Sequence, residues 1–194
     1  MTTIVAVKKN GLVAIAADTL TTFGNTRLPS VMDNSHDKIL HIKDSYIGVC
    51  GSAAHHLVLA SLLGKTPDAQ LNSKEAIFET FRKLHPVLKE ECFLNPKEDE
   101  EDPYESSQIT ALIINASGMY GIFSMREVFE YTKFWAIGSG HEFALGAMQH
   151  AYTRYDNAAD IARAGVDAGI AFDKNSAAPI TIYTVSLNNA TTQI

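Results

Sequence analysis

The first eighteen residues of this 194-residue chain constrain its fold and its chemistry more than any other segment. Residues 2–7 and 12–17 are two short runs of strand-forming residues. Asn10-Gly11 lies between them, and this pair favours the tight turn of a β-hairpin. Such a hairpin turns the chain back on itself, so it is expected to place Asp18 beside Thr2.

Thr2 becomes a candidate nucleophile if Met1 is removed. A hydroxyl is a weak nucleophile at neutral pH and needs a base beside it. A free α-amine, with an ordinary pKa of about 7.7 to 8.0, can be that base, so one residue would carry both groups. The pattern therefore predicts hydrolytic chemistry that needs no histidine. The alternative is that Met-Thr is an ordinary start without a chemical role.

Composition narrows the classes of partner and compartment. The net charge of −6 and the lack of a basic stripe argue against nucleic acid or an anionic membrane as the main partner. No apolar run reaches the ~18 residues of a membrane span, and the start does not have the pattern of a signal peptide. Two cysteines, Cys50 and Cys92, favour packed free thiols over a disulfide scaffold. We therefore expect a cytoplasmic protein.

Hydrophobic periodicity predicts strands, two helices, strands, two helices and a last strand. The expected strands are 2–7, 12–17, 38–42, 46–50, 109–115, 119–124, 128–132, 134–137 and 180–186, and the expected helices are 52–63, 72–92, 140–155 and 158–172. We expect the first four strands to form one sheet and the next four another. Asn72 with Glu75 is expected to cap the second helix, and Pro86 to kink or end it. The order suits one α+β domain over residues 1–194, a four-layer αββα sandwich of two antiparallel sheets with a helix pair outside each.

An acidic segment, residues 95–108, interrupts this pattern. It contains Lys97-Glu-Asp-Glu-Glu-Asp102 between two prolines, a composition that cannot bury itself. We expect a surface loop within the domain. A solvated loop is the simpler interpretation, and an acidic docking site is the alternative.

Four further motifs carry candidate chemistry. Ser-His-Asp-Lys-Ile-Leu-His-Ile, residues 35–42, puts Lys38 at the start of a strand, and Cys-Gly-Ser-Ala-Ala, residues 50–54, puts a glycine between a strand and a helix. Gly-Ser-Gly-His-Glu-Phe-Ala, residues 138–144, predicts a capping box of Ser139 with Glu142. Asp-Lys-Asn-Ser, residues 173–176, ends the last helix as a polar turn. Each motif alone has an ordinary structural meaning.

Taken together and in this order, these motifs resemble the proteasome β-subunit and HslV family of N-terminal-threonine hydrolases, over nearly the whole chain. The family fold is the same αββα sandwich, called the Ntn-hydrolase fold. The resemblance implies that Thr2 is the nucleophile, that Asp18 orients it, and that the charge of Lys38 favours the neutral amine and the developing alkoxide. The chain departs from the family twice, in a longer segment between Gly24 and Lys38 and in Ser52, which replaces a glycine.

The resemblance also implies roles around this centre. The Gly51 N–H would bind the oxyanion, Ser139 would help to pass protons, and Asp173 and Ser176 would hydrogen-bond the amine and hydroxyl of the nucleophile. An extended peptide would lie along a pocket lined by Thr21, Thr22, Val49 and Ala53. Relatives bind a cation through backbone carbonyls that correspond to Ile170, Asp173 and Ser176, and oxygen ligands suit Na⁺ or Mg²⁺.

The expected function is therefore a self-compartmentalising threonine peptidase acting on polypeptides, with no required cofactor. The resemblance implies homo-oligomeric stacked rings, with about 12 to 14 subunits. The chain has no Gly-x4-Gly-Lys phosphate loop, so any ATP-driven unfolding requires an unfoldase partner. Two alternatives remain open, a related amidase acting on small molecules, and a catalytically silent ring or scaffold protein if Met1 is retained.

Overall fold

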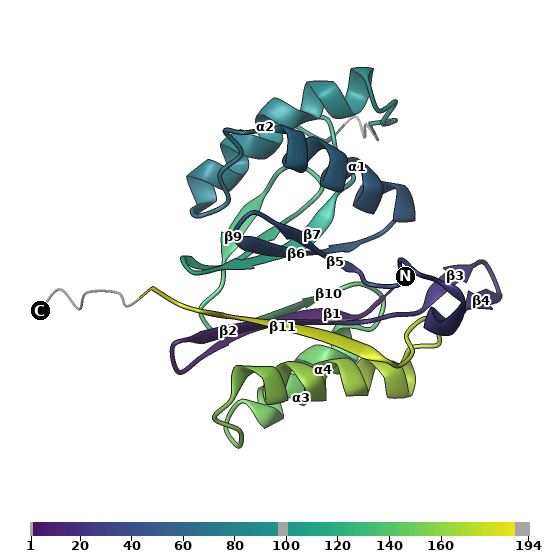
Figure 1. Cartoon of the computed structure of the whole chain (residues 1–194), viewed down its shortest axis with the longest axis vertical. Helices are drawn as coiled ribbons and strands as arrows, with labels where there is room; N and C mark the ends of the chain where they lie inside the picture. Colours follow the sequence, from purple (N-terminus) through teal and green to yellow (C-terminus); the bar gives the residue numbers. More distant parts are fainter. Residues whose placement is uncertain (1, 97–100, 189–194) are drawn as a thin grey trace, which may run out of the picture.

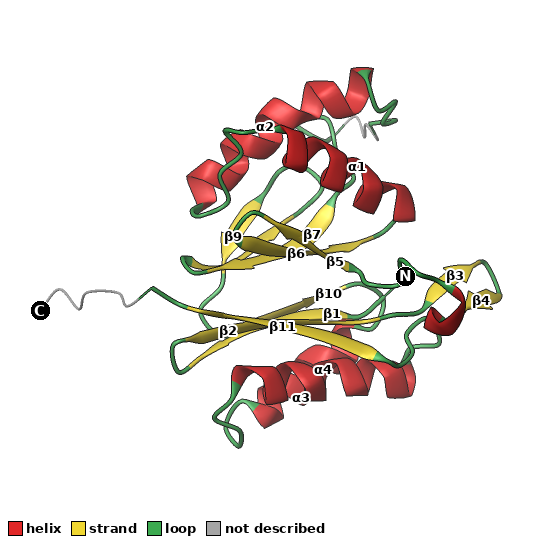
Figure 2. Cartoon of the chain, viewed as in Figure 1, coloured by secondary structure: helices red, strands yellow, loops and turns green. Residues whose placement is uncertain are grey.

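The chain folds into two antiparallel sheets that face each other between two layers of helices, as Figures 1 and 2 show. This computed structural model describes residues 2–96 and 101–188. Helices α1 (Ala53–Lys65) and α2 (Lys74–Glu90) cover one sheet, and α3 (His141–Ala151) and α4 (Ala158–Phe172) cover the other. The predicted αββα sandwich is confirmed.

The first sheet has the order β10-β1-β2-β11. Its strands are β1 (Ile4–Lys9), β2 (Leu12–Asp18), β10 (Phe134–Ile137) and β11 (Ile180–Ser186). The predicted hairpin pairs Ile4 with Ala17, and the Asp18 N–H donates to the Thr3 carbonyl at 3.2 Å. The hairpin therefore brings Asp18 next to the residues that precede β1.

The second sheet has the order β5-β6-β7-β8-β9. Its strands are β5 (Ile39–Ile42), β6 (Ser45–Cys50), β7 (Thr110–Asn115), β8 (Gly118–Ile122) and β9 (Val128–Glu130). The predicted grouping of strands into sheets was wrong. Strands β5 and β6 pair with β7 in the second sheet and not with the first hairpin, and β10 pairs with β1 in the first sheet and not with the strands that precede it. Local patterns identify strands, but the connection after Asp18 crosses to the opposite layer, which no local pattern reveals.

Alternation along β1 divides the interior into layers, because successive side chains in a strand point to opposite faces. Ile4 and Ala6 pack in the cluster between the two sheets, whereas Val5 and Val7 pack with side chains of α3 and α4. All four are fully buried. The strand that follows Thr2 is thus fixed on both faces.

Short elements differ from the sequence expectations in three places. The segment between the second and third expected strands, to which the sequence assigns no element, contains a small hairpin, β3 (Thr21–Phe23) with β4 (Thr26–Leu28), and a short 3₁₀ helix, η1 (Ser30–Met32). The N-cap of α2 is Ser73, whose Oγ accepts from the Ala76 N–H, and not Asn72. Helix α2 also continues through Pro86 to Glu90. The carbonyl that Pro86 leaves unbonded belongs to exposed Arg82, where water can reach it.

The acidic segment is only partly a surface loop. Residues 97–100 lie outside the described residues, and residues 101–104 are exposed as predicted. Ser106 and Ser107, in contrast, are buried, and Ser107 Oγ lies 2.9 Å from Nδ1 of His85 in α2. Within the described parts of the chain, no helix is long and apolar enough to cross a membrane.

The close approach of the two sheets predicts a specific cost for one added methyl group. A Cβ on Gly48 of β6 would lie 2.7 Å from Ile4 Cγ2 and 3.1 Å from Ile15 Cδ1. Gly48→Ala should therefore lower the free energy of unfolding, measured by urea denaturation, by about 1–3 kcal/mol. Gly64→Ala in α1 is the matched control, since no atom lies within 4 Å of the added methyl. Equal stabilities of the two variants would contradict this packing.

Candidate active site

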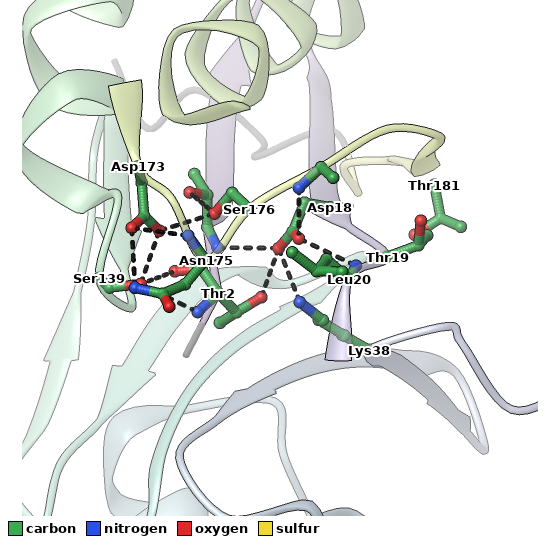
Figure 3. Close-up of polar contacts among 12 residues, drawn as sticks. Thr2, Asp18, Thr19, Leu20, Lys38, Ser139, Asp173, Asn175, Ser176 and Thr181 are labelled. Carbon is green, nitrogen blue, oxygen red and sulfur yellow. Dashed lines mark hydrogen bonds and ion pairs between the residues drawn. The ribbon is translucent and has the colours of Figure 1, made fainter. Parts of the chain in front are cut away.

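Thr2 lies just before β1 and is almost fully buried, at 2% exposure. Its hydroxyl donates to Asp18 Oδ1 at 2.6 Å, and its backbone N–H donates to Ser139 Oγ at 3.2 Å. Figure 3 shows Thr2 between these two groups, with Lys38 approaching from the side of the second sheet. The hydroxyl and the nitrogen of one residue are therefore each held by a different polar partner.

The Asp18 carboxylate is the centre of this arrangement and is fully buried. Its Oδ1 accepts from the Thr2 hydroxyl, from the Thr3 N–H at 3.0 Å and from Lys38 Nζ at 2.8 Å. Its Oδ2 accepts from the N–H groups of Leu20 and Ala177, at 3.0 and 3.1 Å. These donors offset the cost of removing the carboxylate from water.

Lys38 reaches the site in spite of the longer segment before it. Its side chain is 14% exposed, and its ammonium forms an ion pair with Asp18. Burial lowers the pKa of Lys38 below its ordinary value, and the attraction of the Asp18 carboxylate opposes that shift. The Val49 N–H donates to the Lys38 carbonyl at 3.2 Å, which extends the β5–β6 pairing by one residue. The structure thus brings together the predicted trio of Thr2, Asp18 and Lys38.

Ser139 links Thr2 to a second carboxylate. Besides accepting from the Thr2 N–H, its hydroxyl donates to Asp173 Oδ2 at 2.6 Å. The predicted capping box of Ser139 with Glu142 is wrong, because α3 begins one residue later, after Gly140, which has no side chain to cap it. The Ser139 hydroxyl serves the site instead of the helix.

Asp173 is held by its own turn. Asn175 donates to Oδ1 through its N–H and its Nδ2, both at 3.1 Å, and Ser176 Oγ donates to Oδ2 at 2.8 Å. Burial acts to raise the pKa of Asp173, but the hydrogen bonds from Ser139, Asn175 and Ser176 outweigh it and lower that pKa. The expected direct hydrogen bonds from Asp173 and Ser176 to Thr2 are not formed among the described residues. Asp173 connects to the Thr2 nitrogen only through Ser139, and Ser176 Oγ lies 2.7 Å from Thr3 Oγ1.

Two residues of this network were not predicted from the sequence, Thr3 and Asn175. Thr3 is fully buried between Gly140 and Gly169, and a side chain on either glycine would overlap it. Its hydroxyl contacts Ser176, and its N–H contacts Asp18, so it joins the two halves of the site. The sequence offered only a weak signal for Thr3, a second threonine directly after Thr2. The reason for a glycine at position 140, its close contact with Thr3, becomes visible only in the folded chain.

The residues predicted to bind the oxyanion and the peptide differ in how exposed they are. Gly51 follows β6, is exposed and has a φ of +108°, a conformation that glycine adopts readily. Exposed Ala53 begins α1, and Thr21 and Thr22 are partly exposed in β3. Val49 packs mainly in the core between the second sheet and its helices. The roles of these residues toward a substrate remain predictions.

Cys50 is a second potential nucleophile near the site, close to the Lys38 charge and the Gly138 backbone. Burial raises the pKa of its thiol to about 11. Because only the thiolate is strongly nucleophilic, Cys50 is almost entirely in its unreactive form at neutral pH. The Thr2 hydroxyl is the stronger candidate because it is hydrogen-bonded to Asp18, which pairs with Lys38, and a free amine on the same residue can act as its base.

Comparisons with known proteins identify the family of this chain. The family model described as proteasome subunit matches residues 1–185. Among solved structures, BPH from Thiobacillus denitrificans is 38% identical with a TM-score of 0.91, and its complex with epoxomicin is 37% identical with a TM-score of 0.89. Each alignment covers 96% of this chain and 99% of that chain. HslV from Trypanosoma brucei, at 21% identity and a TM-score of 0.70, covers 95% and 99% and shares the fold. A search of curated proteins found no match.

The raised pKa of Cys50 predicts slow alkylation of the folded protein. At pH 8, a thiol with a pKa of about 11 is ionised to about one part in a thousand, against about a quarter for an ordinary cysteine. Iodoacetamide should therefore modify Cys50 far more slowly in the native protein than in urea, as peptide mass spectrometry would measure. Similar rates in both conditions would contradict the unreactive thiol.

Proposed function

Because the chain belongs to the proteasome subunit family, we propose that it is a threonine-type endopeptidase whose nucleophile is Thr2 after removal of Met1. The observation that carries this proposal is the placement of Thr2, whose hydroxyl contacts the Asp18–Lys38 pair while its nitrogen contacts the Ser139–Asp173 pair. A hydroxyl and a free amine on one residue can act as nucleophile and base, and these contacts orient both groups.

The proposed reaction is acyl transfer to the Thr2 hydroxyl. Thr2 Oγ forms a bond to the peptide carbonyl carbon as the free amine of Thr2 takes the hydroxyl proton. The tetrahedral intermediate then expels the leaving amine, which receives that proton, and water hydrolyses the remaining ester to release the acid and restore the hydroxyl. The Gly51 N–H stabilises the oxyanion, and the Lys38 charge stabilises the alkoxide.

Each carboxylate has a separate task in this scheme. Asp18 keeps Lys38 beside the hydroxyl, and its other oxygen, bonded to two backbone N–H groups, fixes its orientation. Asp173 orients the Ser139 hydroxyl toward the amine, where Ser139 can relay protons. In this scheme Asp18 and Lys38 orient the Thr2 hydroxyl, whereas Ser139 and Asp173 orient the Thr2 amine.

The proposed substrate is an extended polypeptide. Its backbone would lie beside Thr21 and Thr22, with a side chain in a pocket to which Val49 and Ala53 contribute. The similar BPH was solved in complex with epoxomicin, and this likeness extends over nearly the whole chain. For this chain, an apolar side chain of moderate size would fit such a set of residues.

A backbone turn could also bind a cation. The carbonyls of Ile170, Asp173 and Ser176 provide only oxygen ligands, which suit a hard ion such as Na⁺ or Mg²⁺. The Asp173 carbonyl accepts the Ser176 N–H at 3.0 Å, and its second lone pair is compatible with an ion. An ion there would stiffen the turn that holds Asp173 and Ser176, and the proposed reaction needs none.

The family resemblance supports assembly into homo-oligomeric stacked rings, with an ATP-dependent unfoldase as a further partner. Large apolar side chains on the outer helices and around η1 are exposed, including Val31 at 90%, Met32 at 76%, Leu57 at 73% and Phe172 at 72%. We propose that subunit contacts in such rings cover these side chains.

The peptidase proposal predicts the effect of changing Thr2. Thr2→Ala should abolish turnover of apolar fluorogenic peptides while the protein still folds, because it removes the nucleophile. Thr2→Ser should keep measurable turnover, since it retains the hydroxyl and the amine. Thr26→Ala, an exposed threonine of β4, is the matched control and should match the wild type. Unchanged turnover in Thr2→Ala would sink the proposal.

The ring proposal predicts the mass of the native particle. Light scattering at micromolar concentration should show about 12 to 14 subunits, since closed rings stacked in pairs bury the exposed apolar side chains. A stable monomer of 21.1 kDa would contradict a chambered protease and favour an amidase for small molecules.

A further inference from the structure

Lys38 depends on a support that the catalytic groups themselves do not provide. It follows a segment that leaves the first sheet after Asp18, forms β3, β4 and η1, and only then enters the second sheet at β5. In Figure 1 this segment projects from the body of the molecule. Lys38 is the last residue before β5, so its backbone lies at the junction between a projecting segment and a sheet.

The residue before Lys38, Asp37, forms hydrogen bonds with residues of both sheets. Its Oδ1 accepts from the Ile39 N–H at 3.0 Å and from Thr181 Oγ1 at 3.1 Å. Its Oδ2 accepts from the Tyr183 hydroxyl at 2.5 Å. Thr181 and Tyr183 are two residues apart in β11, so they share one face of the first sheet, whereas Ile39 begins β5 of the second sheet.

The Tyr183 ring is itself fixed. It stacks on Tyr46 of β6 with ring centroids 4.7 Å apart, and Tyr46 stacks on His41 of β5 at 4.5 Å. The hydrogen bond to Asp37 raises the pKa of Tyr183 to about 12, so the phenol keeps the proton that it donates. The carboxylate of Asp37 therefore accepts from a Tyr183 hydroxyl whose position is fixed by the stacked rings of Tyr46 and His41 in the second sheet.

We propose that Asp37 is a positioning residue, which ties the start of β5 to Thr181 and Tyr183 of β11 and thereby holds Lys38 against Asp18. This inference rests on the proposed peptidase function, in which Lys38 stabilises the alkoxide. The Lys38 backbone is held on one side by the Val49 N–H and on the other by the bonds of Asp37. With both sides held, the side chain extends to Asp18 from a fixed origin.

The hydrogen bonds of Asp37 are not needed to hold the two sheets together. Many apolar contacts already join the two sheets, among them Ile4, Ile15 and Leu112 of one inner cluster. The loss of one hydrogen-bonded carboxylate at the sheet edges would leave that cluster intact. Its main effect would fall on the adjacent residue, Lys38, whose ammonium must stay within hydrogen-bond distance of Asp18.

The test compares Asp37→Ala and Tyr183→Phe with the wild type in peptide hydrolysis. Asp37→Ala should lower kcat by about tenfold and leave KM within about twofold, because a displaced charge affects the transition state more than substrate binding. Tyr183→Phe keeps the stacked ring and should give a smaller drop in kcat. Asp44→Ala, just beyond the opposite end of β5, is the matched control and should retain wild-type kcat, since among the described residues its carboxylate hydrogen-bonds only the adjacent Ser45 hydroxyl.

A second readout does not depend on peptidase activity. An amine-reactive ester should label Lys38 slowly in the wild type and several-fold faster in Asp37→Ala, as peptide mass spectrometry measures, because the freed lysine becomes more accessible. Lys65 serves as the internal reference. If the wild type hydrolyses no peptide, the proposed function fails, and the labelling alone decides whether Asp37 holds Lys38.

Either of two results would overturn the inference. Unchanged Lys38 labelling in Asp37→Ala would show that Asp37 does not hold the lysine, even if kcat falls. Faster labelling with wild-type kcat in an active enzyme would show that the position of Lys38 does not depend on Asp37 in any way that matters to the reaction. Circular dichroism and light scattering confirm that the compared variants fold and assemble alike.

Discussion

The hydrogen-bonded carboxylate of Asp18 is the constraint on which the rest of the site depends. It is fully buried, and its five donors come from the residues before β1, the turn after β2, the start of β5 and the turn after α4. A buried carboxylate without such donors would be strongly destabilising. The fold brings these four segments to one point, where they satisfy the carboxylate, and the same convergence assembles the proposed catalytic groups.

The two-sheet architecture explains why the groups remain separate and oriented. Thr2 lies just before β1 and Asp18 ends β2 of the first sheet, whereas Lys38 enters from the second, so the ion pair crosses the interface between the sheets (Figure 3). Gly138 and Gly140 allow the turn before α3 to approach the backbone of Thr2 and the side chain of Thr3. Packing and polar contacts thus act on the same few residues, and the Asp37 bonds extend this control to the edge of the sheets.

Local sequence patterns predicted the bounds of single elements and the first hairpin. The bounds of α4 and β11 match the expected 158–172 and 180–186, and the first hairpin places Asp18 beside Thr2 as predicted. The family resemblance added Lys38, Ser139 and Asp173, which the fold brings into one network. The assignment of strands to sheets, the use of the Ser139 hydroxyl and the contacts of Asp37 with β11 depend on residues more than thirty positions away, so no local pattern could predict them.

The central claim is that Thr2 carries both the nucleophile and the base, and the direct test is the site at which a peptide epoxyketone, an electrophile with two reactive carbons, modifies the native protein. A residue with a free amine and a hydroxyl can react with both carbons. Mass spectrometry of the treated native protein should show a chain lighter by one methionine residue and a single adduct on the peptide that begins with Thr2. A chain that hydrolyses peptides while it retains Met1, or an adduct on another residue, would contradict the account.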